Sequence, residues 1–226
     1  MINWLHARIH RPEKGWDPVP AAHAAEYASV EWDYGAQSGL LDQVEEWVGG
    51  LAGKSVIDIG GGPGQYSVAL ARRGARVTWH DVSGRYRTIA GERAAQAGVE
   101  VRFSIGYMDE APDTLNEQFD LVFNRICWNY GRGDRSFARC LWRLMKPGGS
   151  AYIDTTPDIF KYDELGWSAR ARIGLNRACG WKIGHPFPPH GRIARIFAQM
   201  PLERMLVDYS SPLNDRIFLR KSGAGR

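Results

Sequence analysis

The chain has 226 residues, of which 44% are hydrophobic, so it is long enough for one domain with a sizeable core and too short for two full ones. Its 29 Lys and Arg outnumber 25 Asp and Glu and give a formal charge of +4, without any long basic run. This balance favours a solvated basic face over a nucleic-acid groove. No apolar run approaches the ~18 residues that a membrane span needs, and the N-terminus lacks the apolar core of a signal peptide, so we expect a cytoplasmic protein outside the membrane.

The three cysteines, Cys127, Cys140 and Cys179, are an odd number and form no CxxC pair. This count predicts neither a disulfide framework nor a zinc site. We expect reduced, buried thiols.

Residues 1–53 are rich in aromatic side chains and precede the first recognisable motif. Prolines at 12, 18 and 20 predict an extended lead-in, followed by a short helix over residues 21–28. Residues 42–48 have the apolar spacing of an amphipathic helix, which Gly49 and Gly50 end. We expect this section to be an N-terminal helical region.

A β-branched run at 56–59 leads directly into a glycine-rich loop at 60–64, and a helix then follows as far as Gly74. Strand, loop and helix together form a cradle, because glycines let a ligand approach the backbone and a helix start favours negative charge. The spacing is GxGxG after Asp58, whereas nicotinamide and flavin enzymes carry GxGxxG. A cluster that merely permits a tight turn is the alternative interpretation.

With this motif the chain resembles the class I S-adenosylmethionine-dependent methyltransferases. In that family the acidic residue and the glycines wrap the methionine part of the cofactor, which the resemblance assigns here to Asp58, Gly60, Gly61, Gly62 and Gly64. The resemblance implies an α/β fold: a doubly wound, three-layer, Rossmann-like sheet of seven strands, mostly parallel, with an antiparallel last strand.

A second strand is predicted over residues 75–79, and Asp81 follows it. A carboxylate about 20 residues beyond the glycine loop can accept both ribose hydroxyls of an adenosine, with Val82 against the adenine. A capping role at the helix over residues 85–97 is the alternative for Asp81, and Ser83 would cap that helix equally well. We expect His80 to be only a neighbour of the site.

The third strand is expected at residues 99–104 and leads to Gly106 and Tyr107. Family members commonly carry an acid where Tyr107 stands, which leaves the contact with the adenine amino group open. Met108 or Asp109 could supply it, and Tyr107 could stack on the ring.

Residues 118–124 resemble the fourth strand of the family, and Asn124 and Arg125 at its end are assigned to the floor beneath the transferred methyl group. A helix is predicted over 134–145. The sequence LMKPGG at 144–149, entering a fifth strand at 150–155, is a family signature.

The last third of the chain is expected to bind the acceptor. A helix over 158–179 and the loop HPFPPHG at 185–191 form an insertion between the fifth strand and a helix over 191–200, and strands at 201–210 and 214–220 complete the sheet. His185 and His190 are candidate general bases, with an ordinary surface position as the alternative. Candidate acceptor contacts are aromatic: Trp32, Tyr34, Trp128 and Tyr130.

We expect no metal, because the ends of the fourth and fifth strands carry Asn124 and Asp154, an incomplete set of hard oxygen ligands. One domain spans residues 1–226, with a lid region at 1–53, a cofactor core at 54–156, an acceptor insertion at 157–190 and a terminal part at 191–220.

The function that this pattern favours is methyl transfer from S-adenosylmethionine to an oxygen or nitrogen of a small molecule, by direct displacement. Aromatic walls with few polar groups indicate a cyclic or aromatic acceptor. Methylation of RNA or protein, and non-catalytic binding of the cofactor, stay open as alternatives. A nicotinamide dehydrogenase would require an accidental LMKPGG. A homodimer is compatible with the sequence.

Overall fold

A seven-stranded sheet is the centre of the structure, a computed structural model that describes residues 3–37, 39–158, 165–179, 182–211 and 213–223, with only the backbone at 3–4 and 33–37. The strand order is β3-β2-β1-β4-β5-β7-β6. The bounds are β1 Ser55–Ile59, β2 Arg76–Asp81, β3 Val101–Ile105, β4 Phe119–Arg125, β5 Met145–Thr155, β6 Leu202–Asp208 and β7 Asp215–Lys221. The strands β1 to β5 pair in parallel, and β7 is antiparallel to both β5 and β6. The predicted fold class is confirmed.

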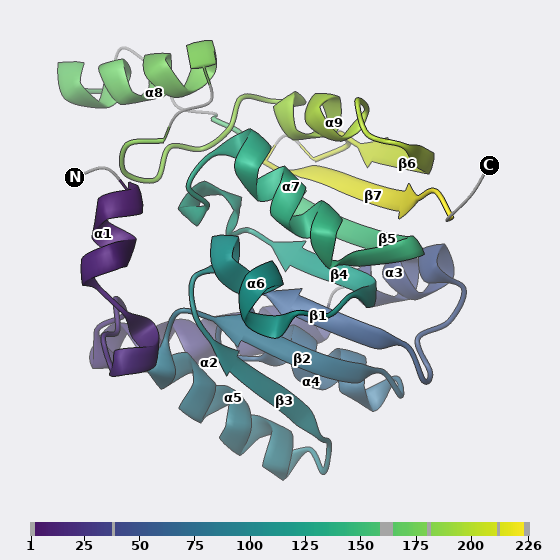
Figure 1. Cartoon of the computed structure of the whole chain (residues 1–226). Helices are drawn as coiled ribbons and strands as arrows, with labels where there is room; N and C mark the ends of the chain where they lie inside the picture. Colours follow the sequence, from purple (N-terminus) through teal and green to yellow (C-terminus); the bar gives the residue numbers. More distant parts are fainter. Residues whose placement is uncertain (1–2, 38, 159–164, 180–181, 212, 224–226) are drawn as a thin grey trace.

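Helices cover both faces of this sheet, so the molecule has three layers (Figure 1). The helices are α1 Asn3–Ile9, α2 Ala21–Gln37, α3 Leu40–Val48, α4 Gln65–Arg72, α5 Gly84–Gln96, α6 Ala111–Leu115, α7 Asp134–Leu144, α8 Trp167–Cys179 and α9 Arg192–Phe197, with 3-10 turns η1 Pro12–Lys14, η2 Met108–Glu110 and η3 Trp128–Tyr130. The helices α6, α7 and α9 lie in front of the sheet in Figure 1, and α3, α4 and α5 lie behind it. Among the described residues, no helix is long and apolar enough to cross a membrane.

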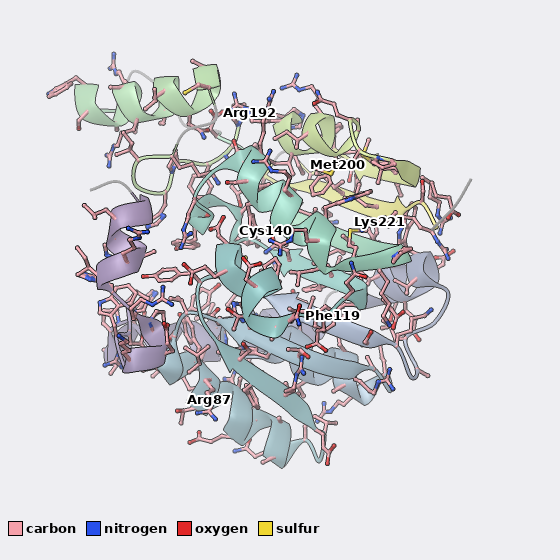
Figure 2. The ribbon with its side chains drawn as sticks, viewed as in Figure 1. Arg87, Phe119, Cys140, Arg192, Met200 and Lys221 are labelled. Atoms are coloured by element: carbon pink, nitrogen blue, oxygen red, sulfur yellow. The ribbon has the colours of Figure 1, made fainter. Side chains whose placement is uncertain are left out.

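Each face of the sheet has its own buried apolar cluster. Alternate strand residues point to opposite faces, so Ile57 and Val122 pack with α7 and α9, whereas Val56 and Leu121 pack with α3 and α4. Phe119 and Cys140, labelled in Figure 2, belong to the first cluster. These clusters fix the strand ends, which carry the site.

The LMKPGG segment differs from the prediction. The strand β5 already begins at Met145, which pairs with Phe119, and Ser150 pairs with Leu121. Six residues of β5 therefore face three of β4, and the surplus forms a bulge. Gly149 is required there because a Cβ would lie 2.9 Å from the Lys146 carbonyl oxygen.

The N-terminal region is more helical than predicted. The helix α1 stands where an extended lead-in was expected, and α2 runs to Gln37 instead of ending at Ala28. α2 packs against α4 and α5, and the backbone carbonyl of Ala28 accepts a hydrogen bond of 2.8 Å from Arg93 Nη2. α2 is thereby placed beside the carboxyl ends of the parallel strands.

Candidate active site

The candidate site lies at the carboxyl ends of β1, β2 and β4. The sheet order places β2 on one side of β1 and β4 on the other, which is the switch point where open α/β sheets bind ligands. α1, α2 and α8 gather at this end of the sheet (Figure 1).

The glycine loop after β1 is held tightly by β2. The N–H groups of Gly60 and Gly61 donate to the carbonyl of His80 at 2.8 and 3.3 Å. Trp79, fully buried, donates from Nε1 to the carbonyl of Gly62 at 3.0 Å. A Cβ on Gly61 would lie 2.3 Å from the indole Cδ1 of Trp79. The glycine is therefore required by close packing against the indole.

Asp81 connects the end of β2 to the glycine loop. Its Oδ2 accepts from the Gly62 N–H at 3.0 Å, and its Oδ1 accepts from the Ser83 N–H at 2.9 Å. Both oxygens keep a second lone pair for a hydroxyl donor. Ser83 itself caps α5 by accepting from Tyr86 N–H, so the capping role that was the alternative for Asp81 belongs to Ser83.

The carboxyl of Asp58 is the other acid of the motif, and it is 3% exposed at the end of β1. Its Oδ2 accepts a hydrogen bond of 2.6 Å from Ser67 Oγ. Burial, reinforced by the nearby charge of Asp81, raises the pKa of Asp58 to about 7. A cationic ligand would favour the charged form, so this acid is suited to sense an ammonium group.

A hollow of about 30 Å³ lies between these groups, lined by Tyr27, Asp58, Gly60, Gly61, Gly62, Pro63, Gln65, Tyr66, Phe123 and Arg125. One of its lining atoms, Gln65 Oε1, is buried and has no hydrogen-bond partner among the described residues. An orphaned buried acceptor is costly unless a donor reaches it. The hollow therefore combines an acid, an orphaned acceptor and a guanidinium.

These groups fit the polar ends of S-adenosylmethionine. Asp58 and Gln65 Oε1 can accept from its ammonium, and Asp81 from its ribose hydroxyls. The hollow has room for about one water molecule and is only part of this site, since Asp81 is not among its lining residues. Cys127 packs against the glycine loop, because its Sγ lies 2.4 Å from where a Cβ on Gly60 would stand.

On the adenine side, the structure separates the two residues that were predicted together. The methyl of Met108 lies 3.8 Å from the position of a Cβ on Gly60, so Met108 faces the loop. Asp109 is directed elsewhere, since its Oδ2 accepts from the backbone N–H of Arg132 at 2.9 Å. Its other oxygen, Oδ1, is buried and has no hydrogen-bond partner among the described residues, so the adenine contact of Asp109 stays a prediction.

Tyr107 and His80 have structural partners. The hydroxyl of Tyr107 donates to the His10 carbonyl at 2.7 Å, and its ring stacks with Trp16 at 6.3 Å between centroids. The buried His80 contacts Ser104 Oγ through Nδ1 at 3.0 Å, and desolvation lowers its pKa to about 4. The imidazole is therefore neutral at physiological pH and braces β2 against β3.

The end of β4 supplies the floor of the hollow. Asn124 is fully buried and donates from Nδ2 to the Ile59 carbonyl at 3.0 Å and to Cys127 Sγ at 2.8 Å. Arg125 lines the hollow directly. Ile126, which follows, has φ +55°, an unusual conformation for a β-branched residue that marks a constrained turn.

The predicted acceptor contacts divide into two groups. Trp128 is 1% exposed and packs against Phe137 and Phe197, so its ring offers no face to an acceptor and its prediction is corrected. Tyr130 is 56% exposed, and its ring lies 4.8 Å from that of His185. Desolvation and the charge of Lys182 lower the pKa of His185.

Trp32 and Tyr34 lie on α2. The ring of Trp32 packs under the guanidinium of Arg93 from α5, 4.3 Å away, which is a packing contact between helices. The side chain of Tyr34 lies outside the described residues. Both therefore stay predictions as acceptor contacts.

His190 has a partner that the sequence did not indicate. Its Nδ1 lies 2.6 Å from Oδ1 of Asp215 at the start of β7, and the other oxygen of this buried acid accepts from Gly191 N–H at 2.7 Å. A carboxylate that fixes one ring nitrogen orients the other outward. Strand pairing brings Asp215 beside Thr155 of β5, a proximity that only the sheet topology shows.

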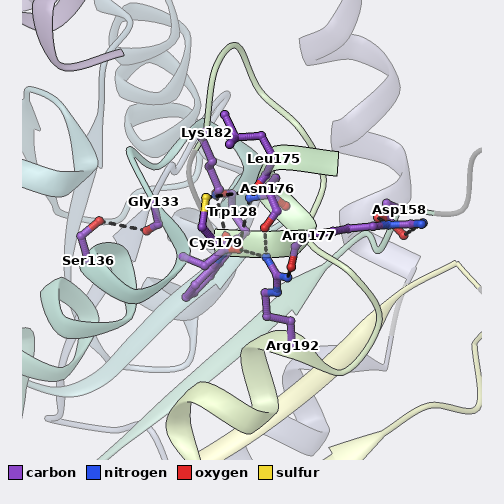
Figure 3. A network of polar contacts seen from close by, with 11 residues as sticks. Trp128, Gly133, Ser136, Asp158, Leu175, Asn176, Arg177, Cys179, Lys182 and Arg192 are labelled. Atoms are coloured by element: carbon purple, nitrogen blue, oxygen red, sulfur yellow. Dashed lines mark hydrogen bonds and ion pairs between the residues drawn. The ribbon is translucent and has the colours of Figure 1, made fainter. Parts of the chain in front are cut away.

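A buried network fastens the segment after α8 to the domain (Figure 3). Lys182, with a fully buried side chain, donates to the Trp128 carbonyl at 2.7 Å and pairs with Asp134 of α7 at 3.1 Å. Arg192 of α9 donates to the carbonyls of Asn176 and Arg177 on α8. The predicted helix over 158–179 begins at Trp167 in the structure, and residues 159–164 lie outside the described part.

The structure is a seven-stranded Rossmann-like domain with a glycine loop after β1 and an acid at the end of β2 that bonds to this loop. Residues 56–149 match the family described as "Methyltransferase domain". This segment, which contains the GxGxG and LMKPGG motifs, is therefore the part of the chain that is similar to methyltransferases.

Two kinds of similar protein support this assignment. Over 136 residues the chain is 32% identical to a ubiquinone biosynthesis O-methyltransferase of Aeromonas salmonicida, which covers 57% of each chain. The aligned part is thus little more than half of the relative's length. Among solved structures, magnesium protoporphyrin IX methyltransferase from Synechocystis PCC 6803 with bound SAM has a TM-score of 0.57 at 18% identity, covering 84% of this chain and 81% of that one.

The [4+2]-cyclase SpnF has a TM-score of 0.59 at 17% identity and covers 82% of this chain and 80% of that one. A protein named for another reaction thus shares the fold, which therefore does not by itself determine the chemistry.

Proposed function

We propose that this chain transfers a methyl group from S-adenosylmethionine to an oxygen or nitrogen nucleophile of a small cyclic or aromatic acceptor. The observation that carries the proposal is the bond from the Gly62 N–H to Asp81. It joins the two motifs that a nucleoside cofactor must contact together, although they lie on different strands. The matching methyltransferase domain over residues 56–149 supports the same reaction.

The residues that would hold the cofactor have distinct tasks. Asp58 and Gln65 accept from the ammonium of its methionine part, Asp81 accepts from the ribose, and Met108 and Val82 offer apolar contact to the adenine. S-adenosylmethionine supplies an electrophilic methyl carbon on a sulfonium. The chain contributes mainly the alignment of the acceptor with that carbon.

Tyr130 and His185 are the proposed acceptor side. Tyr130 follows β4 and His185 lies in the acceptor insertion, and their rings are in contact. Because the pKa of His185 is lowered, its imidazole is unprotonated at neutral pH and can take a proton from a hydroxyl or ammonium acceptor. His190, oriented by Asp215, is the second candidate base.

The printed names of the relatives favour an oxygen acceptor on a ring. The Aeromonas salmonicida relative is a ubiquinone biosynthesis O-methyltransferase, which indicates a ring hydroxyl as the class of acceptor to test first. A hydroxyl must lose a proton during transfer, and a neutral imidazole meets that need.

Calorimetric titration with S-adenosylmethionine, S-adenosylhomocysteine and NADH is the first test. The proposal expects the first two to bind and NADH to be ignored, and Asp81→Ala to abolish binding while the folded protein persists. Binding of NADH alone, or of none of the three, would refute the proposal. A screen for methyl transfer to ring hydroxyls then tests the acceptor class, with RNA and protein acceptors included to test those alternatives.

For the base, His185→Gln is compared with His23→Gln, an exposed histidine on α2 whose ring stacks on Tyr27 and not on Tyr130. We expect about a 10²–10⁴-fold loss of turnover for the first variant and none for the second. Equal turnover of His185→Gln and the native protein across the pH range would exclude this base. A cytoplasmic location and a homodimer stay predictions.

A further inference from the structure

A carboxylate of the chain itself is bound at the rim of the hollow. Glu31 of α2 places one oxygen, Oε2, 3.4 Å from Arg125 Nη1 and 3.4 Å from Gln65 Nε2. Both donors belong to residues that line the hollow. Arg125 lies in β4 and Gln65 in α4, so three distant parts of the chain meet at this one oxygen.

The surroundings of the hollow complement a zwitterionic amino-acid group. Arg125 and Gln65 Nε2 provide donors for a carboxylate, while Asp58 and the orphaned Gln65 Oε1 provide acceptors for an ammonium. Donors and acceptors thus lie within one small cavity. This is the pattern that recognises the α-amino-acid end of a ligand.

Glu31 occupies the carboxylate part of this pattern with poor hydrogen-bond geometry. A single oxygen serves both donors, and both distances are long for charge-assisted hydrogen bonds, which are normally ~2.7–2.9 Å. The Glu31 side chain is 18% exposed and that of Arg125 is 10% exposed, so Glu31 can turn outward into water. A second carboxylate with better geometry can therefore replace it at small cost.

Arg125 would still have a carboxylate partner, Asp154, after another carboxylate replaced Glu31. Its Nε lies 3.5 Å from Asp154 Oδ2, and Asn214 holds the other oxygen of that acid at 2.8 Å. The guanidinium also lies 5.0 Å over the ring of Tyr66. These contacts fix Arg125 from the side of β5, independently of α2.

We infer that Arg125 recognises the carboxylate of the cofactor's methionine part and that Glu31 occupies the same subsite as an internal competitor until the cofactor displaces it. This inference rests on the proposed function and names the regulation of that site. Displacement breaks the contact between α2 and the ends of α4 and β4, which couples occupancy of the hollow to movement of α2.

The test compares the affinities of S-adenosylmethionine and decarboxylated S-adenosylmethionine, which lacks only the carboxylate. Charge-assisted hydrogen bonds predict that the native protein prefers the former by about 10–150-fold. In Arg125→Gln the preference should fall to within about threefold. In Glu31→Gln the affinity for S-adenosylmethionine should rise by about threefold or more, with the decarboxylated ligand unchanged, because the competing charge is gone.

Arg73→Gln is the matched control, since Arg73 pairs with the acids Asp42 and Glu45 away from the hollow; its preference should equal that of the native protein. Circular dichroism confirms the fold of each variant, and Glu31→Gln decides the question if Arg125→Gln does not fold. A preference retained in Arg125→Gln, or an affinity unchanged or lowered in Glu31→Gln, overturns the inference alone. A native protein that binds neither ligand overturns the proposed function and the inference with it.

Discussion

The buried pair of Lys182 and Asp134 offers the sharpest test of how the segment after α8 is attached to the domain. Both side chains are fully buried and 3.1 Å apart. At an effective dielectric constant of about 20 their attraction is about 5 kcal/mol, and removing one partner of such a pair typically costs about 3–5 kcal/mol. In Asp134→Asn the Lys182 ammonium would lose its counter-charge, so we expect a loss of about 3–5 kcal/mol of unfolding free energy.

Lys182→Met should cost less, under about 2 kcal/mol, because Asp134 keeps Arg192 at 3.4 Å and the indole N–H of Trp128 at 3.0 Å. Urea denaturation followed by circular dichroism measures both variants, and the loss in Asp134→Asn corresponds to about 6–20 °C in Tm for a chain of this size.

Asp113→Asn breaks a surface ion pair with Arg143 near the same helix, with side chains 70% and 55% exposed, and should cost less than about 1 kcal/mol. If Asp134→Asn were no more harmful than this control, or if Lys182→Met were the worse of the buried variants, the reasoning from buried charge would be wrong.

Three further predictions concern the site. Because the pKa of His80 falls to about 4 on folding from a model value of 6.5, stability is full above about pH 6.5 and falls by about 3 kcal/mol towards about pH 4; urea titrations should show this slope weakened in His80→Gln. Since the pKa of Asp58 is about 7, binding of S-adenosylmethionine near neutral pH should release a proton, and calorimetry in buffers of different ionisation enthalpy should detect it in the native protein but not in Asp58→Asn. Gly61→Ala displaces the Trp79 indole and should cost about 1–3 kcal/mol and abolish binding of S-adenosylhomocysteine, whereas Gly174→Ala, with open space around it, should preserve both stability and binding.

The parts of the fold that the sequence predicted are those set by local signals. The β-branched run of β1 and the glycines after it mark a strand and a loop wherever they occur, because burial and backbone conformation act over a few residues. The position of Asp81 beside the loop was accessible for the same reason, since its distance from the loop is fixed by one helix and one strand. The same signals could not show that α2 continues to Gln37, because packing against α4 and α5 stabilises it.

The acceptor contact predicted for Trp128 failed because the sequence does not show to which side a ring turns. Trp128 lies in a segment that reaches the site, but its ring packs into the apolar cluster with Phe137. Burying the indole there is more favourable in free energy than leaving it exposed to water. The sequence shows which residues lie close to the site along the chain. It does not show where each side chain points, because that depends on contacts with residues that are distant in sequence.

Contacts with residues distant in sequence also determine the function of the charged side chain of Arg125. Arg125 follows directly from the β4 motif, yet its function depends on Glu31, which is 94 positions away, and on Asp154 of the neighbouring strand. With Asp154 alone, Arg125 would be a structural ion pair; with Glu31 at the rim of the hollow, it becomes a carboxylate site whose occupant can change. The same residue thus stabilises the closed arrangement and recognises the ligand that opens it. Affinity for the cofactor is therefore set partly by the strength of the internal contact that it replaces.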